Sequence, residues 1–298
     1  MNLPIKQHII PKTYLKQFTS DDKNIWLFQK DTKHFREQSI NKVPIIKDFY
    51  TVTDEENDGK KLYDFEYFLA NDIEPLYQLY IEQLQRGKLL SELEKNHFAF
   101  FVSSQKLRSV SMKDKIIKEI ERAFKYGEAG EWFDKTSIEQ FTQHFYEDGK
   151  EITYEEFLEK SEGNLDEIPL DISKDCFVQF LPEKMKDFAE TLASQNWSYL
   201  RAPKGRCFIT SDNPVILDNE IGDSTFPFKG GIFPLTTQLA LNINSLEEKF
   251  RVVGAKELRK INQQIIRNFD RFVFSHNEGI LRSNIKKNSR LMEVTKYV

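Results

Sequence analysis

Phe208-Ile209-Thr210-Ser211-Asp212-Asn213-Pro214-Val215 is the stretch that most constrains the fold of this chain. An apolar, strand-like run stops there at turn-forming residues, and the apolar pattern resumes at Val215. Short Asp and Asn side chains can hydrogen-bond the nearby backbone, while Pro214 fixes its own φ and biases Asn213 toward extended geometry. The stretch therefore predicts a strand that ends at a tight corner and presents the Asp212 carboxylate there.

The sequence around this corner alternates between strand-like and helical patterns. After residue 161 we expect helices at 176–195 and 255–269, and strands at 197–200, 207–210, 231–235, 238–243 and 271–275. Between 64 and 160 the spacing is helical, with expected helices at 64–86, 91–110, 111–127, 136–146 and 153–160. Before residue 64, the pattern indicates a helix at 11–18 and extended pieces at 25–30 and 43–49. These elements predict a small hairpin-like unit.

These patterns predict an α+β protein with a small N-terminal strand and helix unit, a helical middle and a mostly antiparallel C-terminal sheet. We expect two interlocked regions, residues 1–160 and 161–298, which could form one domain.

Composition narrows the class of protein. The 298 residues are 39% hydrophobic and include 25 Phe and 11 Tyr, which excludes a disordered chain. The net charge of −4 gives no overall attraction to nucleic acid or an anionic membrane. Because neither a signal peptide nor a run of about 18 apolar residues is present, we expect a cytoplasmic protein with no membrane partner. The two cysteines, Cys176 and Cys207, have no paired-ligand spacing, so buried thiols are favoured over a disulfide or metal site.

Candidate site residues occur in the N-terminal half. His8 precedes a helix start, where the positive end of the helix dipole favours a neutral imidazole that could act as a base or ligand. On the helix at 91–110, Gln105 and Arg108 share a face, and Arg108 could bind a phosphate or carboxylate in bidentate fashion. An ion pair of Arg108 with Glu66 or Glu74 is the structural alternative.

Further candidates lie in the C-terminal half. Asp212 could ligate a hard cation or act as a general base, and Asn213 could supply a neutral ligand or orient a water. The alternative is a turn whose side chains only satisfy the backbone. Arg267 lies on an amide-rich face of the helix at 255–269, which either faces a site or lies on the surface.

The ordered landmarks of the chain resemble those of the bacterial domain-of-unknown-function family 4238. They are His8-Ile9-Ile10-Pro11-Lys12 with Tyr14, Leu15 and Phe18, then Trp26, Phe49-Tyr50, Glu66, Gln105 with Arg108, and the stretch from Phe208 to Pro214. The family often has a paired histidine at the start, where this chain has Gln7 before His8. The resemblance implies no established activity, but it implies that His8, Gln105, Arg108, Asp212 and Asn213 belong to one recurring set.

A converging set of this kind would suit phosphodiester chemistry. Asp212 would hold a divalent cation such as magnesium or a water, His8 would transfer a proton, and Arg108 would neutralise charge. The expectation is a metal-assisted hydrolase acting on a phosphate-containing substrate, plausibly a nuclease of RNA or DNA in a bacterial defence or toxin setting. The alternative is a non-catalytic sensor that binds a small anionic ligand or a partner protein, and a third reading is a structural hydrogen-bond network.

Overall fold

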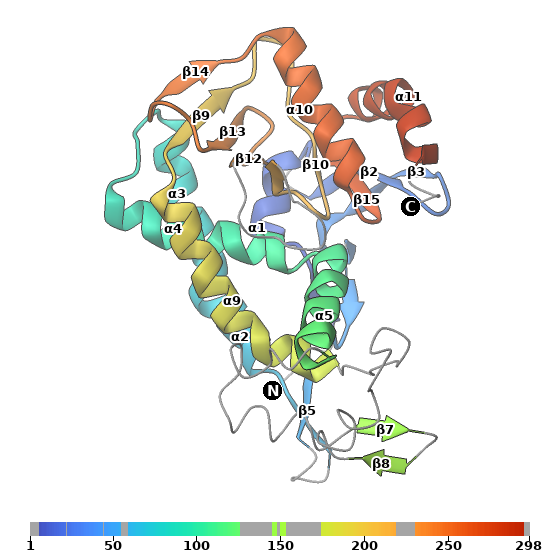
Figure 1. Ribbon diagram of the computed structural model, residues 1–298. Coiled ribbons are helices and arrows are strands. Elements are labelled where there is room, and N and C mark those ends of the chain that lie inside the picture. Colours follow the sequence, from blue (N-terminus) through green and yellow to red (C-terminus); the bar gives the residue numbers. More distant parts are fainter. Residues whose placement is uncertain are drawn as a thin grey trace.

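The structure, a computed structural model, describes residues 6–21, 23–43, 45–54, 59–125, 145–147, 150–152, 174–218 and 230–294. It is an α+β fold, as the sequence predicts, with helices gathered in the middle of the chain and strands in the C-terminal part (Figure 1). In the part of the chain that the structure describes, no helix combines the length and the apolar character that crossing a membrane requires. The predicted boundary between residues 160 and 161 lies outside the described residues.

The N-terminal unit contains two separate strand pairs. Strand β1 (Lys6–His8) pairs antiparallel with β4 (Ile45–Lys47), and β2 (Asn24–Gln29) pairs antiparallel with β3 (Phe35–Ser39). Between them, α1 (Lys12–Leu15) begins directly after Pro11. The prediction that the pieces at 25–30 and 43–49 form a hairpin-like unit is therefore wrong. The polar sequence of β3 gave no strand signal, although its backbone completes the pairing.

The helical middle follows the prediction closely. Helix α2 (Asp64–Phe68) runs through a π-helical segment (Leu69–Ile73) into α3 (Glu74–Gln85), which has Pro75 in its first turn. Helix α4 (Glu92–Leu107) begins with the capping box of Ser91 and Glu94, and α5 (Val110–Lys125) follows.

The sequence predicts two further helices after α5, at 136–146 and at 153–160. The prediction for 136–146 lies mostly outside the described residues, and its last two residues belong instead to strand β7 (Phe145–Glu147), which pairs with β8 (Lys150–Ile152). Cross-strand pairing overrides the local helical spacing there. The helix expected at 153–160 lies outside the described residues.

Two sheets organise the C-terminal half. The larger has the order β11 (Ile216–Asp218), β12 (Gly230–Pro234), β13 (Leu239–Ile243), β9 (Trp197–Arg201) and β14 (Phe250–Val252), and only the β9–β14 pair is parallel. The smaller has the order β10 (Thr210–Ser211), β15 (Phe272–Ser275), β2 and β3. Because β2 comes from the N-terminal unit, the two halves of the chain share one sheet.

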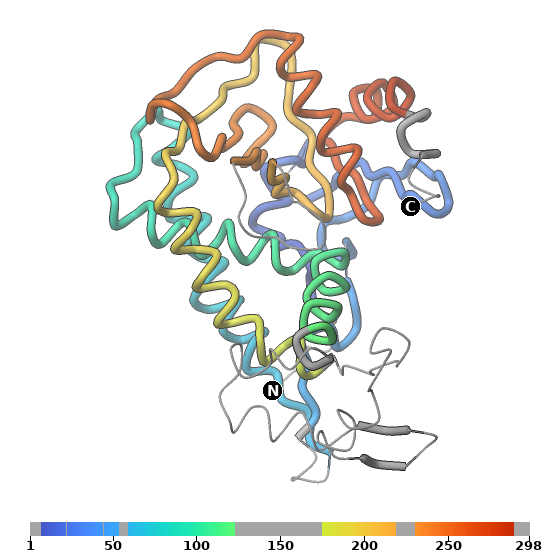
Figure 2. The backbone as a smooth tube through the Cα atoms, in the orientation of Figure 1, coloured from blue at the N-terminus to red at the C-terminus, as the bar shows by residue number. Residues whose placement is uncertain are grey.

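Helices cover both faces of the larger sheet. Successive side chains alternate, so Tyr199 and Leu241 join the main core with α4, whereas Leu200 and Ala240 face the other way. Helix α9 (Lys174–Ser194) packs along α4 with Pro182 inside it (Figure 2).

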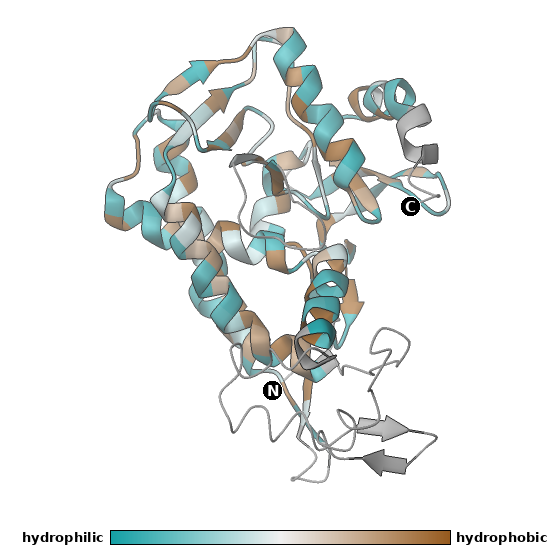
Figure 3. Ribbon diagram, viewed as in Figure 1, coloured by the Kyte–Doolittle hydropathy of each residue, from teal (hydrophilic) through white to brown (hydrophobic). Residues whose placement is uncertain are grey.

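Helix α10 (Ala255–Asn268) connects the two sheets. Its first turns cover the face of the larger sheet that carries Leu200 and Ala240, opposite α4. Its last turns pack with α11 (Glu278–Val294) on the smaller sheet. Apolar and polar segments alternate along its ribbon (Figure 3), as expected for a helix with one buried face.

Tyr14 ties the N-terminal unit to the C-terminal strands. Its ring is fully buried, and its hydroxyl lies 2.6 Å from the Thr210 hydroxyl and donates to the Pro234 carbonyl at 2.7 Å. The bonds span about two thirds of the chain, so this side chain fixes where α1 lies against both sheets.

Tyr14→Phe keeps the buried ring and removes the hydroxyl, which leaves the Pro234 carbonyl without this donor. We expect the free energy of unfolding, measured by urea denaturation, to fall by about 1–3 kcal/mol. Tyr67→Phe is the matched control, because Tyr67 is 42% exposed and should tolerate the same change. Equal loss in the two variants would contradict the assigned role of Tyr14.

Candidate functional site

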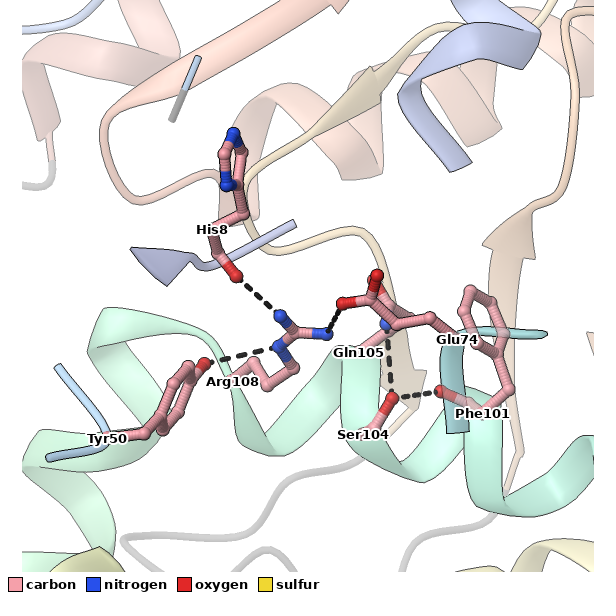
Figure 4. A network of polar contacts seen from close by, with 7 residues as sticks. All are labelled: His8, Tyr50, Glu74, Phe101, Ser104, Gln105 and Arg108. Atoms are coloured by element: carbon pink, nitrogen blue, oxygen red, sulfur yellow. Dashed lines mark hydrogen bonds and ion pairs between the residues drawn. The ribbon is translucent and has the colours of Figure 1, made fainter. Parts of the chain in front are cut away.

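Arg108 lies at the centre of a buried polar network. It caps the C-terminus of α4 and is only 1% exposed. Its Nε donates to the Tyr50 hydroxyl at 3.2 Å, one Nη donates to Glu74 at 2.9 Å, and the other donates to the backbone carbonyl of His8 (Figure 4). These bonds use three of the five N–H donors of a guanidinium. Arg108 therefore connects β1, α3 and Tyr50, which lies two residues before the start of β5 (Val52–Asp54).

Two carboxyl groups accompany Arg108. Glu74 forms the ion pair, as the structural alternative in the sequence analysis allowed, with its side chain 22% exposed. Burial raises the pKa of Glu66 to about 7; the charge of Arg108 opposes this rise and that of Glu74 adds to it. Glu66 Oε2 is buried and has no hydrogen-bond partner. Glu66 is thus a carboxyl group that can carry or release a proton near neutral pH.

The imidazole of His8 is neutral. Burial lowers its pKa to about 4, the positive charges of Lys12 and Arg108 lower it further, and a bond to the backbone of Asn41 opposes the shift. Its Nε2 is buried without a hydrogen-bond partner. The direction of this shift agrees with the neutral form expected from the sequence, but its main cause is burial rather than a helix dipole, since α1 has only four residues.

Gln105 lies one turn before Arg108 on α4. Its Nε2 donates to the Ser104 hydroxyl at 3.1 Å (Figure 4). Its Oε1 is a third buried atom without a partner. We call His8, Glu66, Glu74, Gln105 and Arg108 the Arg108 group. His8, Glu66 and Glu74 of this group are partly exposed, whereas Gln105 and Arg108 are buried.

Asp212 lies in a different hydrogen-bond group. The predicted corner is present directly after β10, and the Asp212 carboxylate accepts the backbone N–H groups of Asp270, Arg271 and Phe272 at 2.7–3.0 Å. Burial raises its pKa to about 7, with a contribution from the charge of Asp270, and the three N–H bonds oppose this shift. The carboxylate thus holds the turn between α10 and β15, which is the structural alternative weighed for it.

Asn213 extends this second group. Its side chain donates to the Ser111 hydroxyl at 3.2 Å and to the carbonyl of Asn268 at 3.0 Å, while its Oδ1 is buried without a partner. Among the described residues, no hydrogen bond or ion pair joins His8 to Asp212. The structure brings His8, Glu66, Gln105 and Arg108 together, and places Asp212 and Asn213 around the start of α5.

The remaining predicted features lie apart. Arg267 is on the exposed side of the last turn of α10, whereas Asn262 from the same amide-rich stretch is buried and bonds the backbone of Cys207 and Ile209. Both cysteines are buried free thiols, as predicted. Within the described ranges, no three His, Cys, Asp or Glu side chains are grouped so as to hold a metal ion. The roles predicted for Asp212, Asn213 and Arg267 stay predictions.

Tyr50 is not among the site residues that the sequence predicts. The only signal for it was an aromatic pair, Phe49-Tyr50, in an irregular stretch. Its hydroxyl contacts Arg108, and its ring centroid lies 5.6 Å from the Arg108 Cζ, within the range of a cation–π contact. Only the folded chain reveals that a residue 58 positions away holds this arginine.

Asp212→Asn tests the turn. An amide has one acceptor oxygen in place of two and would turn an NH₂ group toward backbone N–H donors. We expect the free energy of unfolding to fall by about 1–3 kcal/mol. Asp218→Asn, at an exposed residue of β11, is the control and should change little. Full stability of Asp212→Asn would show that the three N–H bonds are not needed to hold the turn.

Comparison with known proteins places the chain in a family. The family described as "Protein of unknown function (DUF4238)" matches residues 6–279. Neither the comparison with curated proteins nor that with solved structures gives a match. The matched range covers the Arg108 group, the Asp212 corner and the strands between them. The chain therefore belongs to the DUF4238 family.

Proposed function

We propose that this chain is a hydrolase of a phosphate-containing substrate and that its chemistry takes place at the Arg108 group. The observation that carries the proposal is a pair of buried polar atoms, His8 Nε2 and Glu66 Oε2, that lack hydrogen-bond partners beside one guanidinium. Buried polar atoms are rarely left unpaired, and titratable groups with shifted pKa values concentrate at functional sites.

The proposal assigns the proton transfer to Glu66. A general base or acid works best when its pKa is near the working pH, and the Glu66 pKa of about 7 meets that condition. His8, with a pKa of about 4, is a weak base but a neutral hydrogen-bonding group that can orient a water or a substrate oxygen. The sequence-based assignment of His8 as the proton-transfer residue is therefore revised within the proposal.

The reaction would be a displacement at phosphorus. Glu66 removes a proton from the attacking water, the new P–O bond forms as the bond to the leaving oxygen breaks, and the same proton passes to that oxygen. The positive charge of Arg108 stabilises the negative charge on the phosphoryl oxygens. RNA or DNA is the substrate that we propose first, in the bacterial cytoplasm and in a defence or toxin setting. A divalent cation such as magnesium remains a predicted cofactor.

A second candidate is a non-catalytic sensor that binds a small anionic ligand or a partner protein. The observation that favours it is the Asp212 corner, because the carboxylate first expected to act as base or metal ligand is bonded to three backbone N–H groups. In that case the Arg108 group would bind an anion without transferring a proton.

Glu66→Gln tests the assignment of the acid–base residue. Fluorescent single-stranded RNA, single-stranded DNA and duplex DNA are incubated with the protein, with and without magnesium. We expect the wild type to cleave at least one of them and Glu66→Gln to be slower by a factor of roughly a hundred or more, the scale for losing a general base. Glu82→Gln, at an exposed residue of α3, should retain full activity. Full activity of Glu66→Gln rejects the assignment, and absence of cleavage by the wild type favours the sensor.

The pH dependence of stability tests the two shifted pKa values independently of activity. Glu66 has a folded-state pKa above its ordinary 4.5, so its contribution to stability is present below pH 4.5 and is lost as the pH rises through about 7. His8 has a folded-state pKa below its ordinary 6.5, so its contribution is present above pH 6.5 and is lost as the pH falls through about 4.

Urea unfolding at pH values from 4 to 8 separates these opposite contributions. The stability difference between wild type and Glu66→Gln should decrease from pH 4.5 to 7. The difference between wild type and His8→Asn should increase from pH 4 to 6.5. Differences that do not change with pH would show that neither group is shifted.

A further inference from the structure

A pocket of about 440 Å³ adjoins the Arg108 group. Its walls come from the segment Tyr50 to Val52, from β6 (Lys60–Leu62), from α2 and from the first turns of α9. Most of the lining side chains are apolar, and three of them are aromatic: Tyr50, Phe65 and Phe68. Its size lies within the usual range for small-molecule sites.

Tyr50 links the pocket to the Arg108 group. Its ring lines the pocket, and its hydroxyl accepts the hydrogen bond from Arg108 Nε. The ring is fully buried, contacts the guanidinium of Arg108 and packs against Phe65, so Tyr50 holds the Phe65 ring in place and offers no free face of its own. A ligand in the pocket would therefore lie against a preorganised Phe65 ring.

The pocket also lies next to the proposed acid–base residue. Phe65 and Phe68 of α2 line it, their ring centroids are 6.1 Å apart, and the Phe65 ring is 5.5 Å from that of Tyr50. Glu66 follows Phe65 in the same helix and is not itself a lining residue, but it lies near Tyr50, which lines the pocket. Burial raises the pKa of Tyr50, and the charge of Glu66 adds to the rise. A group bound on these rings would have its neighbouring atoms close to Glu66.

The polar lining residues are few and lie at the rim. Asp64 and Gln179 are both exposed, and they offer a carboxylate acceptor and an amide that can donate and accept. Aromatic walls with hydrogen-bonding groups at one edge suit a planar heterocycle, which has apolar faces and polar edges. Bases stack on aromatic side chains in this way in proteins that bind single-stranded nucleic acids.

We propose that this pocket binds the nucleobase of the substrate, which makes the substrate a nucleotide or a single-stranded nucleic acid. This inference rests on the proposed function for the position of the phosphate at the Arg108 group. The base would lie on the partly exposed rings of Phe65 and Phe68, and its edge would bond Asp64 and Gln179. The phosphate of the nucleotide would extend toward Glu66.

Binding of nucleosides tests the pocket without the phosphate. Adenosine, guanosine, cytidine and uridine are titrated into the full chain and followed by calorimetry, with inorganic phosphate and benzyl alcohol as separate probes. We expect at least one nucleoside to bind and benzyl alcohol to bind more weakly. Phe65→Ala should weaken nucleoside binding roughly tenfold, within the range for loss of one stacked aromatic residue.

Gln179→Trp provides a second variant, because this exposed rim residue can be enlarged without disturbing the core. The indole should block the mouth of the pocket and abolish nucleoside binding. Glu190→Trp, at an exposed residue further along α9, is the control and should bind as the wild type does.

The outcomes separate this proposal from the proposed function. Nucleoside binding that Gln179→Trp abolishes, without cleavage of any nucleic acid, supports the pocket and rejects the hydrolase. Cleavage by the wild type with no nucleoside binding at millimolar concentration rejects the pocket and keeps the hydrolase. Unchanged nucleoside binding in both Phe65→Ala and Gln179→Trp, or binding of benzyl alcohol as tight as that of the nucleosides, also overturns the pocket assignment.

Discussion

The buried guanidinium of Arg108 is the interaction on which the central part of the structure depends. Removing one partner of a buried ion pair costs about 3–5 kcal/mol, because the other charge is left uncompensated. Arg108 satisfies this constraint with groups from three separate segments: Glu74 of α3, the carbonyl of His8 in β1, and Tyr50. Since each segment must be in place for the charge to be paired, the network fixes the N-terminal unit against the helices.

The same constraint explains why the pKa values of two residues in the Arg108 group are shifted. Because β1 and α2 are held against Arg108, His8 and Glu66 are partly removed from water. Burial lowers the pKa of His8 and raises that of Glu66, so both groups favour the neutral form. Buried polar atoms are rarely left unpaired, and two of them, His8 Nε2 and Glu66 Oε2, accompany one guanidinium here. Their occurrence together supports the proposed site, because single unpaired atoms also occur elsewhere, as at Asn213 Oδ1.

The Asp212 corner shows the opposite outcome for a similar sequence signal. There the carboxylate accepts three backbone N–H groups, and Asn262 on the same side of the fold bonds the backbone of the strand before the corner. A corner rich in Asp and Asn identifies a place where side chains bond the backbone, and it does not by itself identify catalysis. Glu66 differs from Asp212 in that its Oε2 is buried and has no hydrogen-bond partner.

The sequence by itself determined the α+β class, the helices 64–86, 91–110 and 255–269, and the family, because periodicity, capping and short ordered motifs are local properties. It also singled out His8, Glu66, Gln105 and Arg108. Only the tertiary structure decided that β2 pairs with β15, that Tyr50 contacts Arg108, and that Asp212 lies in a separate hydrogen-bond group. Each of these features depends on contacts between residues far apart in the chain. Burial and the geometry of the hydrogen-bond partners set the pKa values, and both exist only after such contacts form.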